Sequence, residues 1–319
     1  MTEERVSPEY HISEEIGPRY KILVVQLNPE AKPEMQIAGC LFGLPEGKKS
    51  EISDYSSRLL VSRLQTSSSK EEPDKPQREL AADKNFTGRE FFRNNPEEVQ
   101  GIVITGSPFS PYPRLTEEGK PFLTLWKREI ITFMRRAVEQ GVPILGICFG
   151  AQILAEALGG ETEQMKTKEA EEVWEWGWSV IKRMPGSIDD PVMRGLPEEF
   201  VAAQNHKDCI SRLPENGVLL AENQYGIQGF RIDNRKGEPV GWGFQFHPER
   251  TPEEVNRFLF IDPNDQKSPM RVQKRRQELA KAGLDPDKIA SLAERHELQC
   301  PQVTIIFNNF LEFVRSKAI

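Results

Sequence analysis

The sequence predicts an α/β fold in which helices cover both faces of a mostly parallel sheet. Four short apolar segments are typical of strands, and their lack of strict alternation with polar residues indicates burial on both faces. Between the second and third lies a segment with helical periodicity, and strand, helix and strand in this order predict a right-handed parallel crossover. The four strand segments are residues 21–26, 101–105, 142–147 and 241–246.

The crossover helix is predicted from apolar residues that recur at three-to-four spacing. They are Phe122, Trp126, Ile130, Phe133, Met134, Ala137 and Val138. Gly141 and Pro143 then end the helix. Residues 151–158 predict a second helix, and residues 303–314 a third that packs back on the sheet.

The middle of the chain is richer in short strand-like pieces. Residues 175–180, 218–221 and 229–232 are separated by Pro, Gly and Asn signals. We therefore expect an antiparallel extension of the sheet there.

Two stretches look like additions to this core. Residues 66–80 are polar, charged and proline-bearing, which favours a surface loop. Residues 268–281 and 285–298 look like two helices joined at Gly283, so a helical insertion is expected near 262–300. The first of these helices carries the basic cluster Lys274-Arg275-Arg276. We interpret this cluster as a solvated helix face rather than as a binding site for an anion or a partner.

Length and composition are typical of an ordinary water-soluble protein. With 319 residues, we predict an N-terminal extension over 1–19 and a single domain over 20–319. Hydrophobic residues make up 37% and charged residues 29%, and the net charge of -7 argues against nucleic acid as a partner. No apolar run approaches the ~20 residues that cross a bilayer, and the start lacks the form of a secretory signal. A cytoplasmic protein without a membrane partner is expected.

The cysteines are widely separated and show none of the paired spacings of zinc sites or disulfide frameworks. They are Cys40, Cys148, Cys209 and Cys300. All four are expected to be free thiols, and three of them to be small buried apolar residues.

Cys148 differs from the others because it lies between Gly146 and Gly150, after an apolar strand and before a helical segment. This is the layout of a nucleophile on a sharp strand-to-helix turn, where small neighbours avoid a collision. The helix that follows points its N–H groups and positive dipole end at the sulfur, which favours the thiolate.

A cysteine nucleophile needs a base and a group that orients the base. His11 lies in a polar N-terminal segment and His296 in the expected insertion, so neither is well placed. His247 follows a buried strand, where α/β proteins present site residues. Glu249 lies two residues further, with Pro248 stiffening the turn, so its carboxylate can reach the far ring nitrogen of His247.

These residues carry a family resemblance. The run Gly-Ile-Cys-Phe-Gly-Ala-Gln at 146–152, followed by Phe-Gln-Phe-His-Pro-Glu at 244–249, resembles the class I glutamine amidotransferases. The resemblance extends from about Lys21 to the end, apart from the additions. It implies a flavodoxin-like, three-layer sandwich, a catalytic triad of Cys148, His247 and Glu249, and chemistry that requires no metal or organic cofactor.

Two weaker motifs agree with this family. Ile-Thr-Gly-Ser-Pro at 104–108 is similar to the strand-end loop that supplies an oxyanion-hole amide. Glycine at a strand end lets a backbone N–H approach the substrate oxygen, so Gly106 and Phe149 are the expected donors. Many members carry a further glycine where this chain has Thr105.

The second motif, Gln-Asn-His-Lys-Asp at 204–208, resembles the family's His-x-Asp loop, which helps recognise the amino-acid end of the glutamyl group. The resemblance implies substrate binding by Asn205, His206 and Asp208, and by Gln152 of the helix after the nucleophile. Motifs at residues 175–178, 195–197 and 228–230 look most like the stand-alone branch similar to the amidotransferase domain of GMP synthase.

The expected reaction is hydrolysis of a γ-glutamyl amide, in glutamine or a γ-glutamyl compound, through a γ-glutamyl thioester on Cys148. No Gly-rich phosphate loop is visible, so the chain either acts alone, which we favour, or delivers ammonia to a separate synthetase. Two other interpretations remain: a cysteine esterase of the α/β-hydrolase type, and an inactive regulatory or binding module on the same scaffold.

Overall fold

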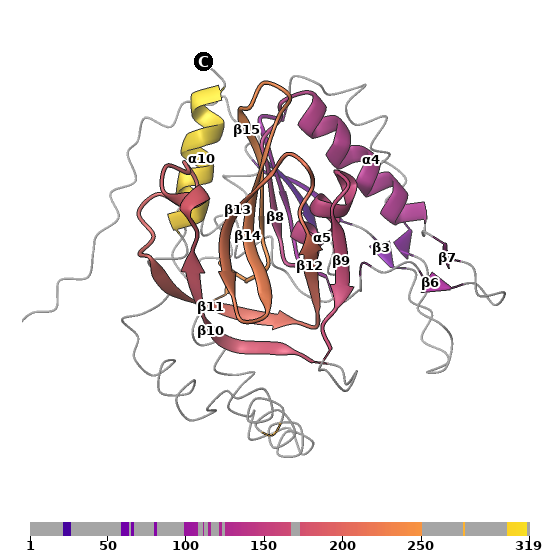
Figure 1. The fold of residues 1–319 in the computed structure, drawn as a ribbon. Helices are drawn as coiled ribbons and strands as arrows, with labels where there is room; N and C mark the ends of the chain where they lie inside the picture. The colour runs from indigo at the N-terminus through magenta and orange to yellow at the C-terminus, as the bar shows by residue number, and fades with distance from the viewer. Residues whose placement is uncertain are drawn as a thin grey trace, which may run out of the picture.

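The computed structural model describes the central sheet, the helices against it and several short connections. The described residues are 22–26, 59–63, 65–66, 80–81, 99–107, 111, 114–115, 121–122, 125–166, 173–250, 277 and 305–317. Within them an 11-stranded sheet forms the centre of the molecule, and Figure 1 shows the helices α4, α5 and α10 beside it.

One part of the sheet is parallel. Its strands lie side by side in the order β15-β8-β5-β1-β2, and every neighbouring pair runs parallel. The four predicted strands are all present here, and the α/β fold is confirmed. The strands are β1 (Ile22–Gln26), β2 (Leu59–Arg63), β5 (Gly101–Ile104), β8 (Ile144–Ile147) and β15 (Pro239–Phe244).

Helices pack on both faces of this sheet. Alternate side chains of a strand point to opposite faces, and in β5 Ile102 and Ile104 pack with α4 (Leu125–Glu139) and α5 (Phe149–Ala157). Val103, between them, packs in a second cluster with α10 (Ile305–Lys317). In the part of the chain that the structure describes, no helix has the length and apolar composition of a membrane span.

The C-terminal helix docks on the sheet, as its spacing predicts. Its Phe310 meets the fully buried Trp242 of β15 edge to face, with ring centroids 6.1 Å apart. The amide nitrogen of Asn309 donates to the carbonyl oxygens of Val192 and Arg194 at 3.0 and 2.7 Å. Polar as well as apolar contacts therefore fix α10.

The antiparallel extension is also confirmed. From β15 the sheet continues through β14, β13, β10 and β11, and these neighbours all run antiparallel. Two further strands, β12 and β9, pair with each other, and β12 also pairs with β14. The strands are β9 (Glu161–Gln164), β10 (Glu175–Arg183), β11 (Glu199–His206), β12 (Asp208–Arg212), β13 (Gly217–Asn223) and β14 (Gly226–Asp233).

The segment 204–208 is not the loop that its sequence predicts. Gln204, Asn205 and His206 are the end of β11, and Asp208 begins β12, so only Lys207 lies between the strands. Polar residues that usually mark a turn are accommodated in the sheet because neighbouring strands supply polar partners.

Short elements complete the described structure. The predicted surface loop near 66–80 is bounded by an antiparallel pair of two-residue strands, β3 and β4. The N-terminal extension, Cys40, Cys300 and, apart from Gln277, the helical insertion near 262–300 lie outside the described residues. The short elements are β3 (Gln65–Thr66), β4 (Leu80–Ala81), β6 (Arg114–Leu115), β7 (Pro121–Phe122) and the 3-10 turn η1 (Pro185–Ser187).

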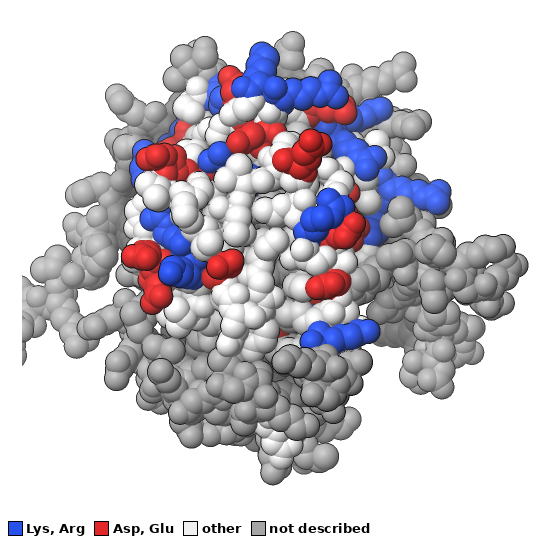
Figure 2. Space-filling model, viewed as in Figure 1, with Lys and Arg blue, Asp and Glu red and all other residues white. Residues whose placement is uncertain are grey.

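Charges of both signs share the molecular surface. On the face shown in Figure 2, the described Lys and Arg side chains lie among Asp and Glu side chains around a largely uncharged centre. This face is therefore of mixed sign rather than uniformly basic or acidic.

Candidate active site

Cys148 lies on the turn that joins β8 to α5. Its φ of 51° and ψ of -110° make it the only residue other than glycine with positive φ in the described ranges. This backbone is strained for a residue with a Cβ. The carbonyl of Cys148 accepts the first hydrogen bond of α5, from Gln152 N at 3.0 Å. Cys148 therefore occupies the N-terminal cap of the helix, as the sequence predicts.

The two glycines beside Cys148 are required by close backbone contacts. A Cβ on Gly146 would lie 2.7 Å from the carbonyl atoms of Gly150, and one on Gly150 would lie 2.3 Å from the carbonyl oxygen of Ile104. Both contacts are with backbone, which cannot rotate away. The expectation that bulkier neighbours collide in this turn is confirmed.

We expect Gly150→Ala to destabilise the protein by about 1–3 kcal/mol, because the added methyl group must push α5 away from β5. Chemical denaturation gives this free energy. Gly141→Asn is the matched control: Gly141 has φ 73° and no atom within 4 Å of an added Cβ, and Asn tolerates such a conformation. Equal stability of Gly150→Ala and the wild type would contradict the close packing of the turn.

Backbone hydrogen bonds fix the relative position of Cys148 and His247. Cys148 N donates to Phe244 O, at the end of β15, at 2.7 Å. His247, three residues further, donates its own N–H to Ala203 O of β11 at 2.9 Å. Since β8 and β15 are parallel neighbours, both residues follow the carboxyl ends of adjacent strands. The two side chains thus come from one edge of the sheet.

The surroundings of Gly106 show how close the side chains of Cys148 and His247 are. A Cβ on Gly106 would lie 3.1 Å from Cε1 of His247 and 3.4 Å from Cβ of Cys148. The loop after β5, the cysteine turn and the histidine turn therefore meet at one point. The structure brings together Cys148, His247 and Gly106, which are far apart in the sequence.

His247 and Glu249 form a buried pair. His247 Nδ1 lies 2.6 Å from Glu249 Oε1, and the two residues are 8% and 4% exposed. Burial alone would lower the pKa of His247, but the charges of Glu249 and then Cys148 outweigh it and raise that pKa. Burial raises the pKa of Glu249, and the His247 charge more than reverses this and lowers it. Each partner thus favours the charged form of the other.

The second ring nitrogen of His247 faces a different environment. Among the described residues, Nε2 is buried without a hydrogen-bond partner. Cys148 influences the ring through its charge, although no hydrogen bond of ordinary geometry joins its sulfur to Nε2. Nε2 is therefore the nitrogen that can exchange a proton with a reacting group.

The pair predicts a pH-dependent stability. Because folding lowers the pKa of Glu249, its carboxylate stabilises the folded protein at pH values above 4.5, the ordinary pKa of the group. This stabilisation is lost as the pH falls through the lowered pKa. Because folding raises the pKa of His247, its imidazolium stabilises the folded protein fully at pH values below 6.5, the ordinary pKa of the group. This stabilisation is lost as the pH rises from 6.5 through the raised pKa. We expect the free energy of unfolding to decrease as the pH rises above 6.5, and Glu249→Gln to flatten this decrease. Urea unfolding at several pH values measures both slopes, and identical slopes would show that the pair is not coupled.

Gln152 and Gln245 connect Cys148 to β12. Gln152 Nε2 donates to the carbonyl oxygen of Asp208 at 2.8 Å and to Gln245 Oε1 at 3.1 Å. Gln245, which is fully buried, in turn donates to the sulfur of Cys148 at 3.7 Å. Gln245 was not predicted as a site residue, although it lies two residues before His247 in the motif at 244–249.

His206 and Asp208 are both buried, at the end of β11 and the start of β12. His206 Nδ1 is 2.9 Å from the carbonyl oxygen of Asp208, and Nε2 is 2.8 Å from Glu175 Oε2. Glu175 also accepts hydrogen bonds from Gln228 Nε2 at 2.9 Å and Asn223 Nδ2 at 2.5 Å. These partners could not be predicted from the sequence because they come from β10, β13 and β14.

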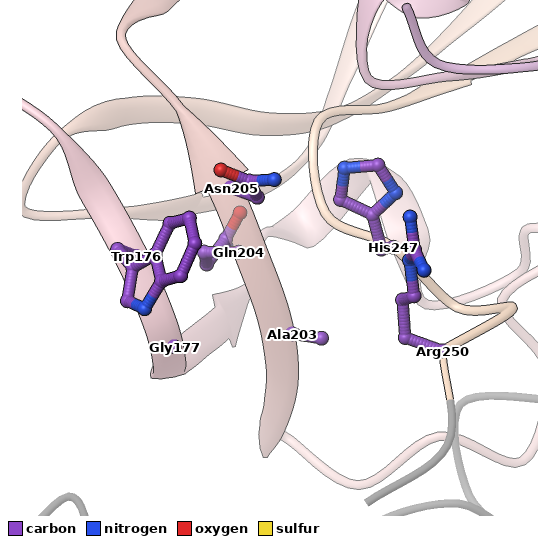
Figure 3. Close-up of a pocket in the computed structure, with 7 residues that line it drawn as sticks. All are labelled: Trp176, Gly177, Ala203, Gln204, Asn205, His247 and Arg250. Atoms are coloured by element: carbon purple, nitrogen blue, oxygen red, sulfur yellow. The ribbon is translucent and has the colours of Figure 1, made fainter. Parts of the chain in front are cut away.

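A pocket opens beside His247. Its described lining residues are Trp176, Gly177, Ala203, Gln204, Asn205, His247 and Arg250. Figure 3 shows His247 and Arg250 on one side, and Trp176, Gln204 and Asn205 on the other, on β10 and β11. Of the four residues implied in substrate binding, Asn205 is the one that lines this pocket. Arg250 was not identified from the sequence.

Cys209 provides a contrast to Cys148. It is a free, buried thiol on β12, as predicted. Burial, followed by the nearby charge of Glu163, raises the pKa of this thiol to about 11. Cys209 is therefore protonated and inert near neutral pH.

Comparison with known proteins identifies the family of the chain. The family model for glutamine amidotransferase class-I matches residues 77–262, more than half of the chain. The chain belongs to the class I glutamine amidotransferase family. The resemblance found in the sequence is thus confirmed.

Relatives in sequence include GMP synthases [glutamine-hydrolyzing]. That of Thermosipho africanus is 32% identical over 160 residues, which cover 49% of this chain and 26% of the relative. That of Aquifex aeolicus is 33% identical over 162 residues, which cover 51% of this chain and 26% of the relative. The matched region is therefore about a quarter of the length of these proteins.

Solved structures show the same fold. A glutamine amido transferase from Methylobacillus flagellatus matches with a TM-score of 0.53 at 20% identity, over 92% of this chain and 95% of that one. A glutamine amidotransferase from Thermotoga maritima matches with a TM-score of 0.51 at 20% identity, over 93% and 98% of the two chains.

Proposed function

We propose that this protein hydrolyses a γ-glutamyl amide bond through a γ-glutamyl thioester on Cys148. The observation that carries the proposal is the junction of Cys148, His247 and Gly106, where an added methyl group on Gly106 would lie 3.1 Å from the imidazole and 3.4 Å from Cβ of the cysteine. The closely paired Glu249 then orients the imidazole.

The first half of the reaction forms the thioester. The Cys148 thiolate attacks the amide carbon, and the negative charge moves to the carbonyl oxygen. We assign the oxyanion donors to the backbone N–H groups of Gly106, beside the nucleophile, and Phe149, at the start of α5. His247 Nε2 gives its proton to the amide nitrogen, the carbon–nitrogen bond breaks, and the amine leaves.

The second half releases the acid. His247 Nε2 takes a proton from water, the resulting hydroxide adds to the thioester carbon, and the carbon–sulfur bond breaks to return the thiolate. Glutamate is the acyl product, and no metal or organic cofactor enters any step. Glu249 keeps the tautomer and orientation of the imidazole throughout.

Substrate contacts follow from the pocket. We assign Asn205 to direct contact with the substrate because it lines the pocket opposite His247. Gln152, His206 and Asp208 complete the binding region by holding β11 and β12 against α5, through the hydrogen bond from Gln152 to the Asp208 carbonyl and the contact of His206 with the same oxygen.

We also propose a flavodoxin-like, three-layer fold for the single domain over 20–319. Coverage of the sheet by α4 and α5 on one face and by α10 on the other supports a flavodoxin-like, three-layer arrangement.

A glutaminase subunit that delivers ammonia to a separate synthetase is the second candidate function. The observation that favours it is the similarity to GMP synthases, of which this chain matches only about a quarter.

One experiment tests the proposed function and separates the two candidates. Purified protein is offered glutamine and a panel of γ-glutamyl peptides, and glutamate release is followed. Release by the protein alone supports independent hydrolysis. Activity that begins only when a synthetase is added supports the second candidate, and ester cleavage without amide cleavage would instead indicate an α/β-hydrolase type of reaction.

A further inference from the structure

Arg250 is a positive side chain at the pocket that the proposed reaction does not use. Among the described residues that line the pocket, it is the only Lys or Arg. Arg250 N donates to the carbonyl oxygen of His247 at 3.3 Å, so the backbone makes a tight turn between them, and both residues line the pocket. In Figure 3 its guanidinium lies on the same side of the pocket as His247.

The proposed reaction determines which part of a substrate lies near Arg250. His247 protonates the departing nitrogen, so this nitrogen and whatever it carries must lie beside the imidazole. The chain attached to the nitrogen then extends past Arg250, into the space bounded on the far side by Trp176 and Asn205.

The chemistry of that space fits an amino acid with a free carboxylate. A guanidinium binds a carboxylate through two parallel hydrogen bonds. The indole of Trp176 offers a flat apolar surface for a short side chain. Glutamine carries only an NH₂ group at this position and leaves both features unused.

We propose that Arg250 binds the carboxylate of the amino acid attached to the γ-glutamyl nitrogen, and that the preferred substrates are therefore γ-glutamyl peptides. This inference rests on the proposed function. The reaction consumes water, breaks the bond between the γ-carbonyl carbon and the nitrogen, and releases glutamate and an amino acid.

Three γ-glutamyl substrates distinguish the effect of this carboxylate from the effect of the α-carboxylate of the glutamyl half. γ-Glutamylglycine carries the carboxylate on the departing glycine. γ-Glutamylglycinamide has nearly the same size but lacks that charge, and glutamine has only the α-carboxylate of the glutamyl half. The ratio of kcat/KM for γ-glutamylglycine to that for γ-glutamylglycinamide measures the contribution of the glycine carboxylate. Effects of a variant on folding or on Glu249 change both values equally and cancel in the ratio.

The variants are Arg250→Gln, which removes the charge, and Arg250→Lys, which keeps it without the two-pronged geometry. We expect Arg250→Gln to lower the ratio by about 10- to 100-fold, mainly through KM, as for the loss of a hydrogen bond between charged groups. Arg250→Lys should recover part of the ratio. Lys207→Gln is the matched control, because Lys207 Nζ lies 5.5 Å from the centre of the Trp174 ring and does not line the pocket, and its ratio should equal that of the wild type.

Other outcomes overturn the proposal. Equal kcat/KM of the wild type for the two dipeptide donors would show that the carboxylate is not recognised. An equal loss for both donors in Arg250→Gln would show that Arg250 acts through the neighbouring Glu249. A loss for glutamine as large as that for γ-glutamylglycine would assign Arg250 to the α-carboxylate. In these three cases hydrolysis itself still stands, whereas no glutamate release from any donor would also refute the proposed function.

Discussion

Replacement of Cys148 by alanine is expected to abolish glutamate release from every γ-glutamyl donor while the protein stays folded. The thioester cannot form without the sulfur, and loss of a nucleophile that acts together with its base costs on the order of 10⁴-fold or more in rate. Cys209 cannot replace it, since its buried thiol has a pKa of about 11. Glutamate release measures the rate, and thermal unfolding shows that the fold is kept.

Cys209→Ala is the matched control for this substitution. It removes a second buried, free thiol from a neighbouring part of the sheet and should leave turnover near that of the wild type. Mass spectrometry of the wild type during turnover should detect a glutamyl group on the peptide that contains Cys148. Turnover by Cys148→Ala within tenfold of the wild type would refute the thioester route.

Replacement of His247 by asparagine is expected to lower kcat by about 10²- to 10⁴-fold, the usual contribution of a positioned acid and base. The variant loses the proton donor for the departing amine. It also loses the positive partner of the thiolate, which the raised pKa of His247 provides near neutral pH. Steady-state rates with γ-glutamylglycine, and the rate at which iodoacetamide alkylates Cys148 at pH 7, measure the two effects separately.

A second γ-glutamyl substrate distinguishes the two functions that we propose for His247. p-Nitroaniline is a weak base and departs with less help from a proton than glycine does. The loss of kcat in His247→Asn should therefore be smaller for γ-glutamyl-p-nitroanilide than for γ-glutamylglycine. Equal losses would mean that the imidazole acts on the sulfur and not on the leaving group.

Local signals explain why much of the fold and the core of the site could be predicted. Apolar runs without alternation identify buried parallel strands, and the glycines at 146 and 150 mark the sharp turn because only hydrogen fits there. The reach of Glu249 to His247 depends on a spacing of two residues, so the motif itself contains the geometry.

Contacts between distant strands explain what sequence reasoning missed. The polar run at 204–208 looks like a loop because its partners lie elsewhere: Glu175 on β10 contacts His206, and Gln228 on β14 accepts a hydrogen bond from Gln204. Neither partner can be assigned before the order of the strands is known. The same holds for Gln245, whose bond to the sulfur of Cys148 spans 97 residues.

The conformation of Cys148 has a consequence for protein engineering. Glycine adopts a φ of 51° freely, whereas cysteine is strained there. Directed evolution for heat resistance alone would consequently favour glycine at this position and produce a robust but inert protein. Libraries built on this scaffold need an activity screen in parallel, because at this one residue durability and chemistry oppose each other.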